Sequence, residues 1–76
     1  MFSYNISTKA SEKEFKKACE KIEKELVKIE KENILEDVDG SLIQIYTTPN
    51  GKIKVFNDYE VDAVYVDSNV ELKCFN

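Results

Sequence analysis

Three carboxylates lie close together near the end of the chain, at Asp58, Glu60 and Asp62. Paired carboxyl groups can do general acid–base chemistry when a cleft holds their pKa values apart. A chain of 76 residues rarely builds such a cleft, because it buries only about 60% of its unfolded surface. We therefore interpret these carboxylates as part of a binding surface and not as catalytic groups.

The sequence contains few residues that could support other catalytic or cofactor chemistry. The sequence contains no histidine and only two isolated glycines, which excludes an imidazole-based triad, a histidine metal site and a phosphate-binding loop. The segment 37–40, Asp-Val-Asp-Gly, resembles part of a calcium loop, but Leu35 and Tyr46 occupy the first and last ligand positions. We predict a polar turn there, with no catalytic residue, no metal and no cofactor.

The two cysteines, Cys19 and Cys74, stand outside any Cys-x-x-Cys motif. Both fall at apolar positions, which favours buried free thiols, with a helix-to-strand disulfide as the alternative. Met1–Thr8 lacks the basic start and apolar run of a secretory signal, and no stretch reaches transmembrane length. We expect a cytoplasmic protein that does not bind membranes.

The net charge of −4 is unevenly distributed. Lysines balance acidic residues over 1–56, so the whole excess lies in 57–76. The chain has no arginine, whereas nucleic-acid binders cluster Lys and Arg against phosphates. Direct nucleic-acid binding is therefore disfavoured, and a basic protein partner is favoured.

A helix is predicted from Ser11 to about Asn33. Ser11 and Glu14 have the spacing of a capping box. Apolar residues then recur every three or four positions among Glu and Lys, forming a stripe. The stripe consists of Phe15, Cys19, Ile22, Leu26 and Ile29. It also fits a heptad repeat, but it is too short for a stable coiled coil, so we favour packing against a sheet.

The rest of the chain predicts a sheet. Runs of β-forming residues indicate strands at 2–7, 42–48, 52–56, 59–66 and 70–75. Turns are predicted at Pro49-Asn50-Gly51, at 57–58 and at 67–69. The predicted fold is a single α+β domain, 1–76, in the order β-α-β-β-β-β, with one long amphipathic helix on one face of a small, mostly antiparallel sheet.

A single helix covers only one side of such a sheet. We assign the covered side to Phe2, Tyr4, Ile6, Ile43, Ile45, Ile53, Val55, Val61, Ala63, Tyr65, Val70, Leu72 and Cys74. Alternation then leaves an uncovered side formed by Leu42, Gln44, Tyr46, Lys54, Phe56, Glu60, Asp62, Val64, Val66, Glu71, Lys73 and Phe75. An apolar patch rimmed by charge is typical of a protein contact surface, although small sheets also leave some apolar side chains half exposed. The predicted partner-binding residues are Tyr46, Phe56, Asp58, Glu60, Asp62, Val64, Glu71 and Phe75.

Three functional hypotheses follow. The leading one is a non-enzymatic protein-binding module, an inhibitor of the anti-defence or anti-CRISPR type that acts on a nucleic-acid-handling enzyme. Small, acidic, Lys/Glu-rich chains without arginine are typical of phage and mobile-element proteins. The second hypothesis is a structural homo-oligomer, such as a homodimer, that associates through the sheet face or the helix. The third is a small catalytic subunit.

Overall fold

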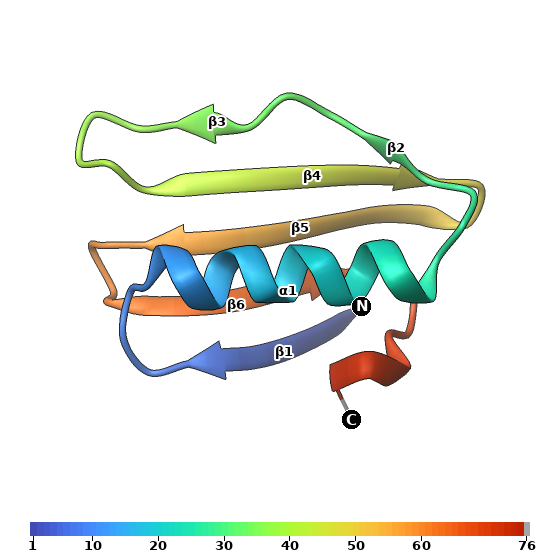
Figure 1. Cartoon of the computed structure of the whole chain (residues 1–76), viewed down its shortest axis with the longest axis horizontal. Coiled ribbons are helices and arrows are strands. Elements are labelled where there is room, and N and C mark those ends of the chain that lie inside the picture. The colour runs from blue at the N-terminus through green and yellow to red at the C-terminus, as the bar shows by residue number, and fades with distance from the viewer. Residues whose placement is uncertain (76) are drawn as a thin grey trace.

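The computed structural model describes residues 1–75 and consists of one helix, a six-stranded sheet and a short C-terminal 3₁₀ turn (Figure 1). The helix α1 spans Glu12–Glu25, and the 3₁₀ turn η1 spans Lys73–Phe75. The strands are β1 (Phe2–Ser7), β2 (Glu30–Lys31), β3 (Leu35–Glu36), β4 (Leu42–Thr48), β5 (Gly51–Asp58) and β6 (Ala63–Ser68). The α+β class and the packing of one helix on an antiparallel sheet are confirmed.

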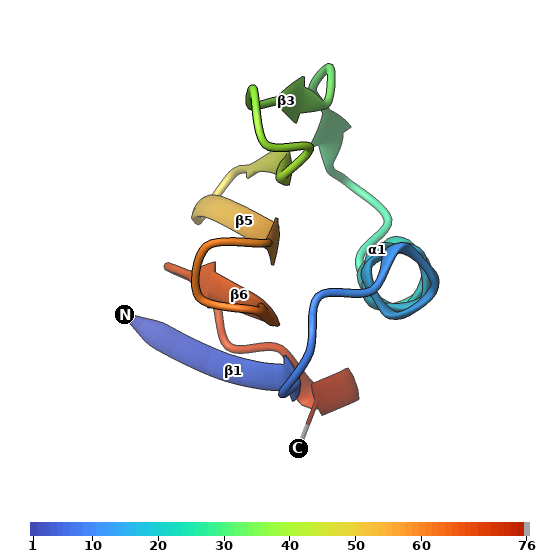
Figure 2. The same ribbon diagram turned by 90° about the vertical axis from the view of Figure 1, so that its left-hand side faces the viewer.

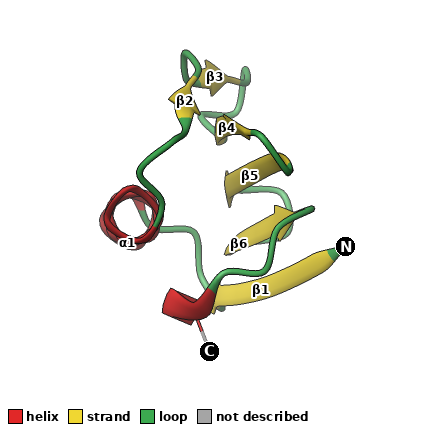
Figure 3. Ribbon diagram, turned by 90° about the vertical axis from the view of Figure 1, so that its right-hand side faces the viewer, coloured by secondary structure: helices red, strands yellow, loops and turns green. Residues whose placement is uncertain are grey.

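The strand order is β1-β6-β5-β4-β2, and β3 also pairs with β4. Every strand pairing is antiparallel. The helix lies on one side of this sheet, and none of the described residues forms a helix on the opposite side (Figure 2). The end-on view in Figure 3 shows η1 on the same side as α1.

The helix begins where the sequence predicts and ends earlier. Ser11 is the N-cap, and its hydroxyl oxygen accepts a hydrogen bond from the N–H of Glu14 at 3.2 Å. The prediction that the helix continues to Asn33 is wrong, because Leu26 has extended backbone angles. The following residues form β2 and β3 instead, where they cover the backbone edge of β4.

The first two long strands match their predicted bounds, and the later ones differ. The turn predicted at 57–58 lies at 59–62, so β5 extends to Asp58 and β6 starts at Ala63. The strand predicted at 70–75 is absent from the described residues, which contain η1 there. Both sides of β6 are already paired, with β1 and β5, so a further strand after β6 has no place beside it.

The core lies between α1 and the sheet. Its buried apolar members are Phe15, Ala18, Cys19, Ile22, Tyr46, Ile53, Val55, Val64, Val66 and Leu72. Three polar side chains, Gln44, Asn57 and Ser68, are also buried. Asn57 Oδ1 accepts the N–H of Ser11 at 2.9 Å and so joins the helix start to the sheet.

Candidate functional site

An apolar row crosses the face of the sheet that α1 leaves uncovered. Leu35 of β3 lies opposite Ile43 of β4, which lies opposite Phe56 of β5. Phe56 in turn lies opposite Tyr65 of β6. Opposite residues in antiparallel strands share a face, so these four side chains form one continuous row. Leu35 is 54% exposed and the other three are half-buried, so the apolar row is accessible.

The centre of the apolar row is an aromatic pair. The rings of Phe56 and Tyr65 are stacked, with centroids 4.6 Å apart and planes inclined by 14°. Such packing fixes both rings before any partner arrives. On the neighbouring row, Ile45 lies opposite Lys54, and Lys54 lies opposite Asp67. The apolar row is therefore bordered by charged side chains along the sheet.

A hollow of about 140 Å³ lies alongside the apolar row and is lined by three of its four members, Ile43, Phe56 and Tyr65. It is formed where the loop between β3 and β4 meets the turn between β5 and β6. Its lining residues are Asp37, Asp39, Ser41, Leu42, Ile43, Phe56, Asn57, Asp58, Glu60 and Tyr65. Four of these residues are acidic, and none of the described residues that line it is basic. We call this site the acidic hollow.

The Asp58 carboxylate of the acidic hollow is held by local hydrogen bonds. Asp58 accepts the N–H groups of Glu60 and Val61 through Oδ1, at 2.9 and 3.3 Å. Its Oδ2 accepts the hydroxyl of Tyr65 at 3.3 Å. Burial, with a smaller effect of the Asp58 charge, raises the pKa of Tyr65, so this hydroxyl stays protonated. The site carries fixed negative charge beside an aromatic surface.

The loop at 37–40 forms the polar turn that the sequence predicts. Asp37 closes the turn at both ends: its N–H donates to the carbonyl of Ser41 at 2.9 Å, and its carbonyl accepts the N–H of Gly40 at 3.0 Å. Asp39 Oδ1 accepts the N–H of Ser41 at 2.9 Å, and this bond lowers the pKa of Asp39. Among residues 1–75, no group of three carboxylate or thiol side chains is placed to hold a metal ion.

The eight predicted partner-binding residues do not form one surface. Phe56, Asp58 and Glu60 meet around the acidic hollow. Tyr46 and Val64 have no exposed surface and face α1, so their assignment to the uncovered side is wrong. Ile43 and Tyr65, assigned to the covered side, lie on the uncovered one, so the structure exchanges the two faces on β4 and β6.

The other three predicted residues lie away from the apolar row. Asp62 Oδ1 accepts the N–H of Ala10 at 2.8 Å, which ties the turn to the chain that leads into α1. Phe75 packs on the helix side against Tyr4, with ring centroids 5.6 Å apart. Glu71 is exposed in the segment between β6 and η1. These residues are not part of the site described here.

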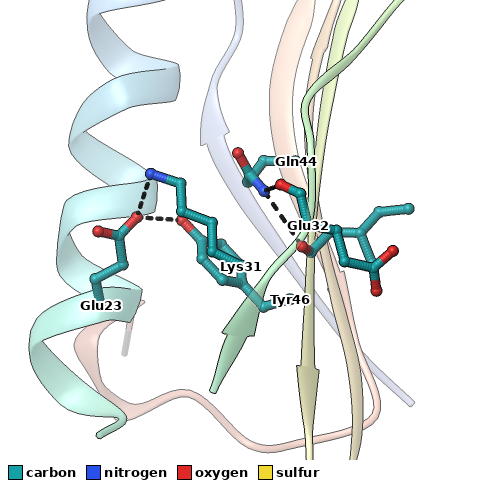
Figure 4. A network of polar contacts seen from close by, with 6 residues as sticks. Glu23, Lys31, Glu32, Gln44 and Tyr46 are labelled. Carbon is teal, nitrogen blue, oxygen red and sulfur yellow. Dashed lines mark hydrogen bonds and ion pairs between the residues drawn. The ribbon is translucent and has the colours of Figure 1, made fainter. Parts of the chain in front are cut away.

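A second polar cluster lies on the helix side of the sheet (Figure 4). The hydroxyl of Tyr46 donates to Glu23 Oε2 at 2.5 Å, and Lys31 Nζ pairs with the same oxygen at 3.1 Å. Gln44 Nε2 donates to the carbonyls of Glu32 and Ile45, at 2.6 and 3.2 Å. These contacts attach β2 and the chain that follows it to both α1 and the sheet.

The Glu23 carboxylate should make the stability of the protein depend on pH. Hydrogen bonding from Tyr46, opposed by burial and aided by Lys31, lowers the pKa of Glu23 below its ordinary value of 4.5. A carboxyl group whose pKa is lower in the folded state stabilises the protein at pH values above its pKa in the unfolded state. This stabilisation is lost as the pH falls through the pKa of the folded state. Tyr46→Phe should therefore reduce the stability that is lost as the pH falls below the ordinary carboxyl pKa of 4.5, by less than about 1 kcal/mol because the carboxylate is 38% exposed. Urea unfolding at several pH values measures this, and an unchanged acid dependence would contradict it.

Both cysteines are free in the structure. Burial raises the pKa of Cys19, and burial together with the Glu25 carboxylate raises the pKa of Cys74 to about 12. Since the thiolate is the reactive form, alkylation of Cys74 near neutral pH should be at least about 100-fold slower in the folded protein than in denaturant, and alkylation of Cys19 should also be slower. Mass spectrometry of iodoacetamide-treated protein measures this. Rapid labelling of either thiol in the native state would contradict the expectation.

Comparisons with protein-family models, curated proteins and solved structures find no match for this chain. Among residues 1–75, no helix has both the length and the apolar character needed to cross a lipid bilayer.

Proposed function

We propose that this chain is a non-enzymatic protein-binding module that binds a basic surface of a larger protein. The observation that carries the proposal is the continuity of the apolar row with the acidic hollow on one face of the sheet. An apolar patch of fixed side chains next to charge is typical of protein contact surfaces. The acidic excess of residues 57–76 also attracts a basic partner before contact.

The acidic hollow is suited to a Lys or Arg side chain of the partner. Phe56 and Tyr65 supply stacked aromatic rings, and Asp58 supplies a carboxylate at their edge. A cation over an aromatic ring gains about 0.5–2 kcal/mol, and a carboxylate strengthens the contact. A cationic segment is therefore preferred here over a neutral one.

The biological role that we propose is inhibition of a nucleic-acid-handling enzyme, of the anti-defence or anti-CRISPR type. Such enzymes bind phosphates with clustered Lys and Arg, and those residues can bind carboxylates in their place. The Lys/Glu-rich, arginine-free composition is typical of phage and mobile-element proteins. We place this activity in the cytoplasm, where two free thiols persist.

Affinity capture from a bacterial lysate with two matched variants tests the binding face. Phe56→Asp places a charge in the apolar row, whereas Val27→Asp makes the same kind of change at a residue that is 90% exposed after α1. A partner of the apolar row should be retained by wild type and Val27→Asp and bound at least about tenfold more weakly by Phe56→Asp. Equal retention by all three proteins overturns the proposal.

The inhibitory role needs a second measurement on the captured protein. If the acidic hollow occupies a phosphate-binding surface, added DNA or RNA should compete with this chain for the partner. Direct binding of the chain to nucleic acid is the necessary control. Simultaneous binding of nucleic acid and this chain to the partner would exclude the inhibitory role while leaving the binding role intact.

Self-association through the uncovered face is the alternative that we keep. The apolar row could meet its own copy across a two-fold axis, which would bury Phe56 and Tyr65. Two acidic hollows would then lie on one interface, and their charges would repel. A dimer that Phe56→Asp dissociates, measured by light scattering, would favour this alternative over an external basic partner.

A further inference from the structure

The two edges of the sheet are built differently. At one edge, β4 is covered by β2 and β3, two-residue strands whose sequences are Glu-Lys and Leu-Glu. Short, charged edge strands are a common protection against pairing with another chain. At the other edge lies β1, which has six residues and, within residues 1–75, pairs with β6 alone.

The edge strand β1 lacks the charged and proline residues that commonly protect an edge, and the one irregularity in its pairing lies toward its C-terminal end. Its sequence, Phe-Ser-Tyr-Asn-Ile-Ser, contains no charge and no proline, in a chain of which 34% is charged. The register irregularity falls between Asn5 and Ser7, so the pairing with β6 is regular from Phe2 to Asn5. Phe2 is 40% exposed at this edge. Among the described residues, no backbone hydrogen bond reaches β1 from any element other than β6.

We propose that β1 pairs with β1 of a second copy of this chain, antiparallel and about a two-fold axis. A second copy is the occupant because an edge strand paired with itself matches each free N–H with a free carbonyl. No charge on either strand opposes the approach. Pairing also covers Phe2, which lies opposite the buried Ser68 and therefore projects to the helix side of the sheet.

The two-fold symmetry determines the relative orientation of the two copies. Opposite residues of antiparallel strands project to the same side, so the two-fold axis is perpendicular to the sheet. Both helices then lie on one side of a continuous sheet, and both apolar rows lie on the other. If the proposed function holds, the dimer presents two partner-binding faces in one plane, which increases avidity for a partner with two basic sites.

The expected dimer is weak, because edge pairing of one strand buries far less than a standard interface. Sedimentation velocity over a range of protein concentrations up to the millimolar range should show a dimer fraction that rises reversibly with concentration. Phe2→Lys should weaken the dimer at least about tenfold, since Lys is the residue that natural edge strands use against pairing. The matched control Val27→Lys introduces the same charge at an exposed apolar residue away from the edge, and it should leave dimerisation unchanged.

Amide hydrogen exchange identifies the edge directly and does not depend on a variant. Exchange in β1 should slow as the protein concentration rises, while exchange in β4 should not change. A wild-type chain that stays monomeric at millimolar concentration overturns the proposal, as does a dimer that Phe56→Asp dissociates and Phe2→Lys does not. Because Phe2→Lys leaves the apolar row intact, it should still capture a basic partner, so failure of dimerisation and failure of partner binding are distinguishable.

Discussion

Phe15→Ala is expected to lower the free energy of unfolding by about 3–5 kcal/mol. Phe15 is 2% exposed and is among the largest side chains that α1 places against the sheet. A domain of this length has about 4–11 kcal/mol of stability in total. The variant should therefore lose a large part of this stability, with a Tm at least about 15 °C lower than that of wild type. Urea and thermal unfolding followed by circular dichroism measure both quantities.

Val27→Ala is the control for this experiment. Val27 is 90% exposed just after α1, so its truncation should change stability by less than about 0.5 kcal/mol. If Phe15→Ala lost less than about 1 kcal/mol, the helix would not be packed on the sheet as described. The proposed binding face would then lose its basis, because it is defined as the side that the helix leaves free.

Hydrophobic periodicity predicts the start and the buried face of the helix correctly, but it does not predict where the helix ends. The cap at Ser11 and the buried positions Phe15, Cys19 and Ile22 follow from sequence spacing. The end does not, because a helix from 11 to 33 would be about 34 Å long, whereas the seven residues of β4 extend about 23 Å. The observed 14 residues extend about 21 Å, which matches the sheet. The length of the surface to be covered, and not local propensity, sets where the helix ends.

On β4, the two faces could not be assigned from the sequence, because one residue in the turn that follows decides them. The observed loop between β4 and β5 has two residues, so Thr48 lies opposite Gly51 and Tyr46 lies opposite Ile53. A three-residue turn through Gly51 instead brings Ile45 and Val55 together, which is the face assignment that proved wrong. A shift of one residue exchanges the two faces of a strand. Both faces of β4 carry β-forming residues, so alternation alone could not correct the error.

The C-terminal segment depends on contacts that no local pattern contains. The carboxylate of Glu25, at the end of α1, accepts the N–H groups of Lys73 and Cys74, at 3.0 and 2.8 Å. The hydroxyl of Tyr4 accepts the N–H of Leu72 at 2.8 Å. These bonds satisfy backbone groups that a strand would otherwise pair in a ladder. Leu72 is nevertheless buried, as alternation predicts, so burial was predictable here and backbone conformation was not.

The turn between β4 and β5, which sets the two faces of β4, is followed by Gly51, the residue with the second large expected effect on stability. Gly51→Ala is expected to lower the free energy of unfolding by about 2–4 kcal/mol. Gly51 has φ +140°, and an added Cβ would lie 2.6 Å from Cβ of Asn69. That atom is close to the backbone, and Asn69 is held by its own N–H bond to the carbonyl of Lys52, so it cannot move freely. Urea unfolding measures the loss.

Two further variants separate the steric cost from the conformational one. Gly40 has φ +88°, but an added Cβ would lie 3.5 Å from the Tyr59 ring, an ordinary contact, so Gly40→Ala should cost only about 1 kcal/mol. Asn69→Gly removes the opposing Cβ. In that background Gly51→Ala should cost about as much as Gly40→Ala does in the wild type, giving a coupling energy of about 1–3 kcal/mol in the double-mutant cycle. A coupling near zero would mean that Gly51 and Asn69 do not approach each other. The register of β5 against β6 at this end of the sheet, where the N–H of Asn69 donates to the carbonyl of Lys52, would then be incorrect.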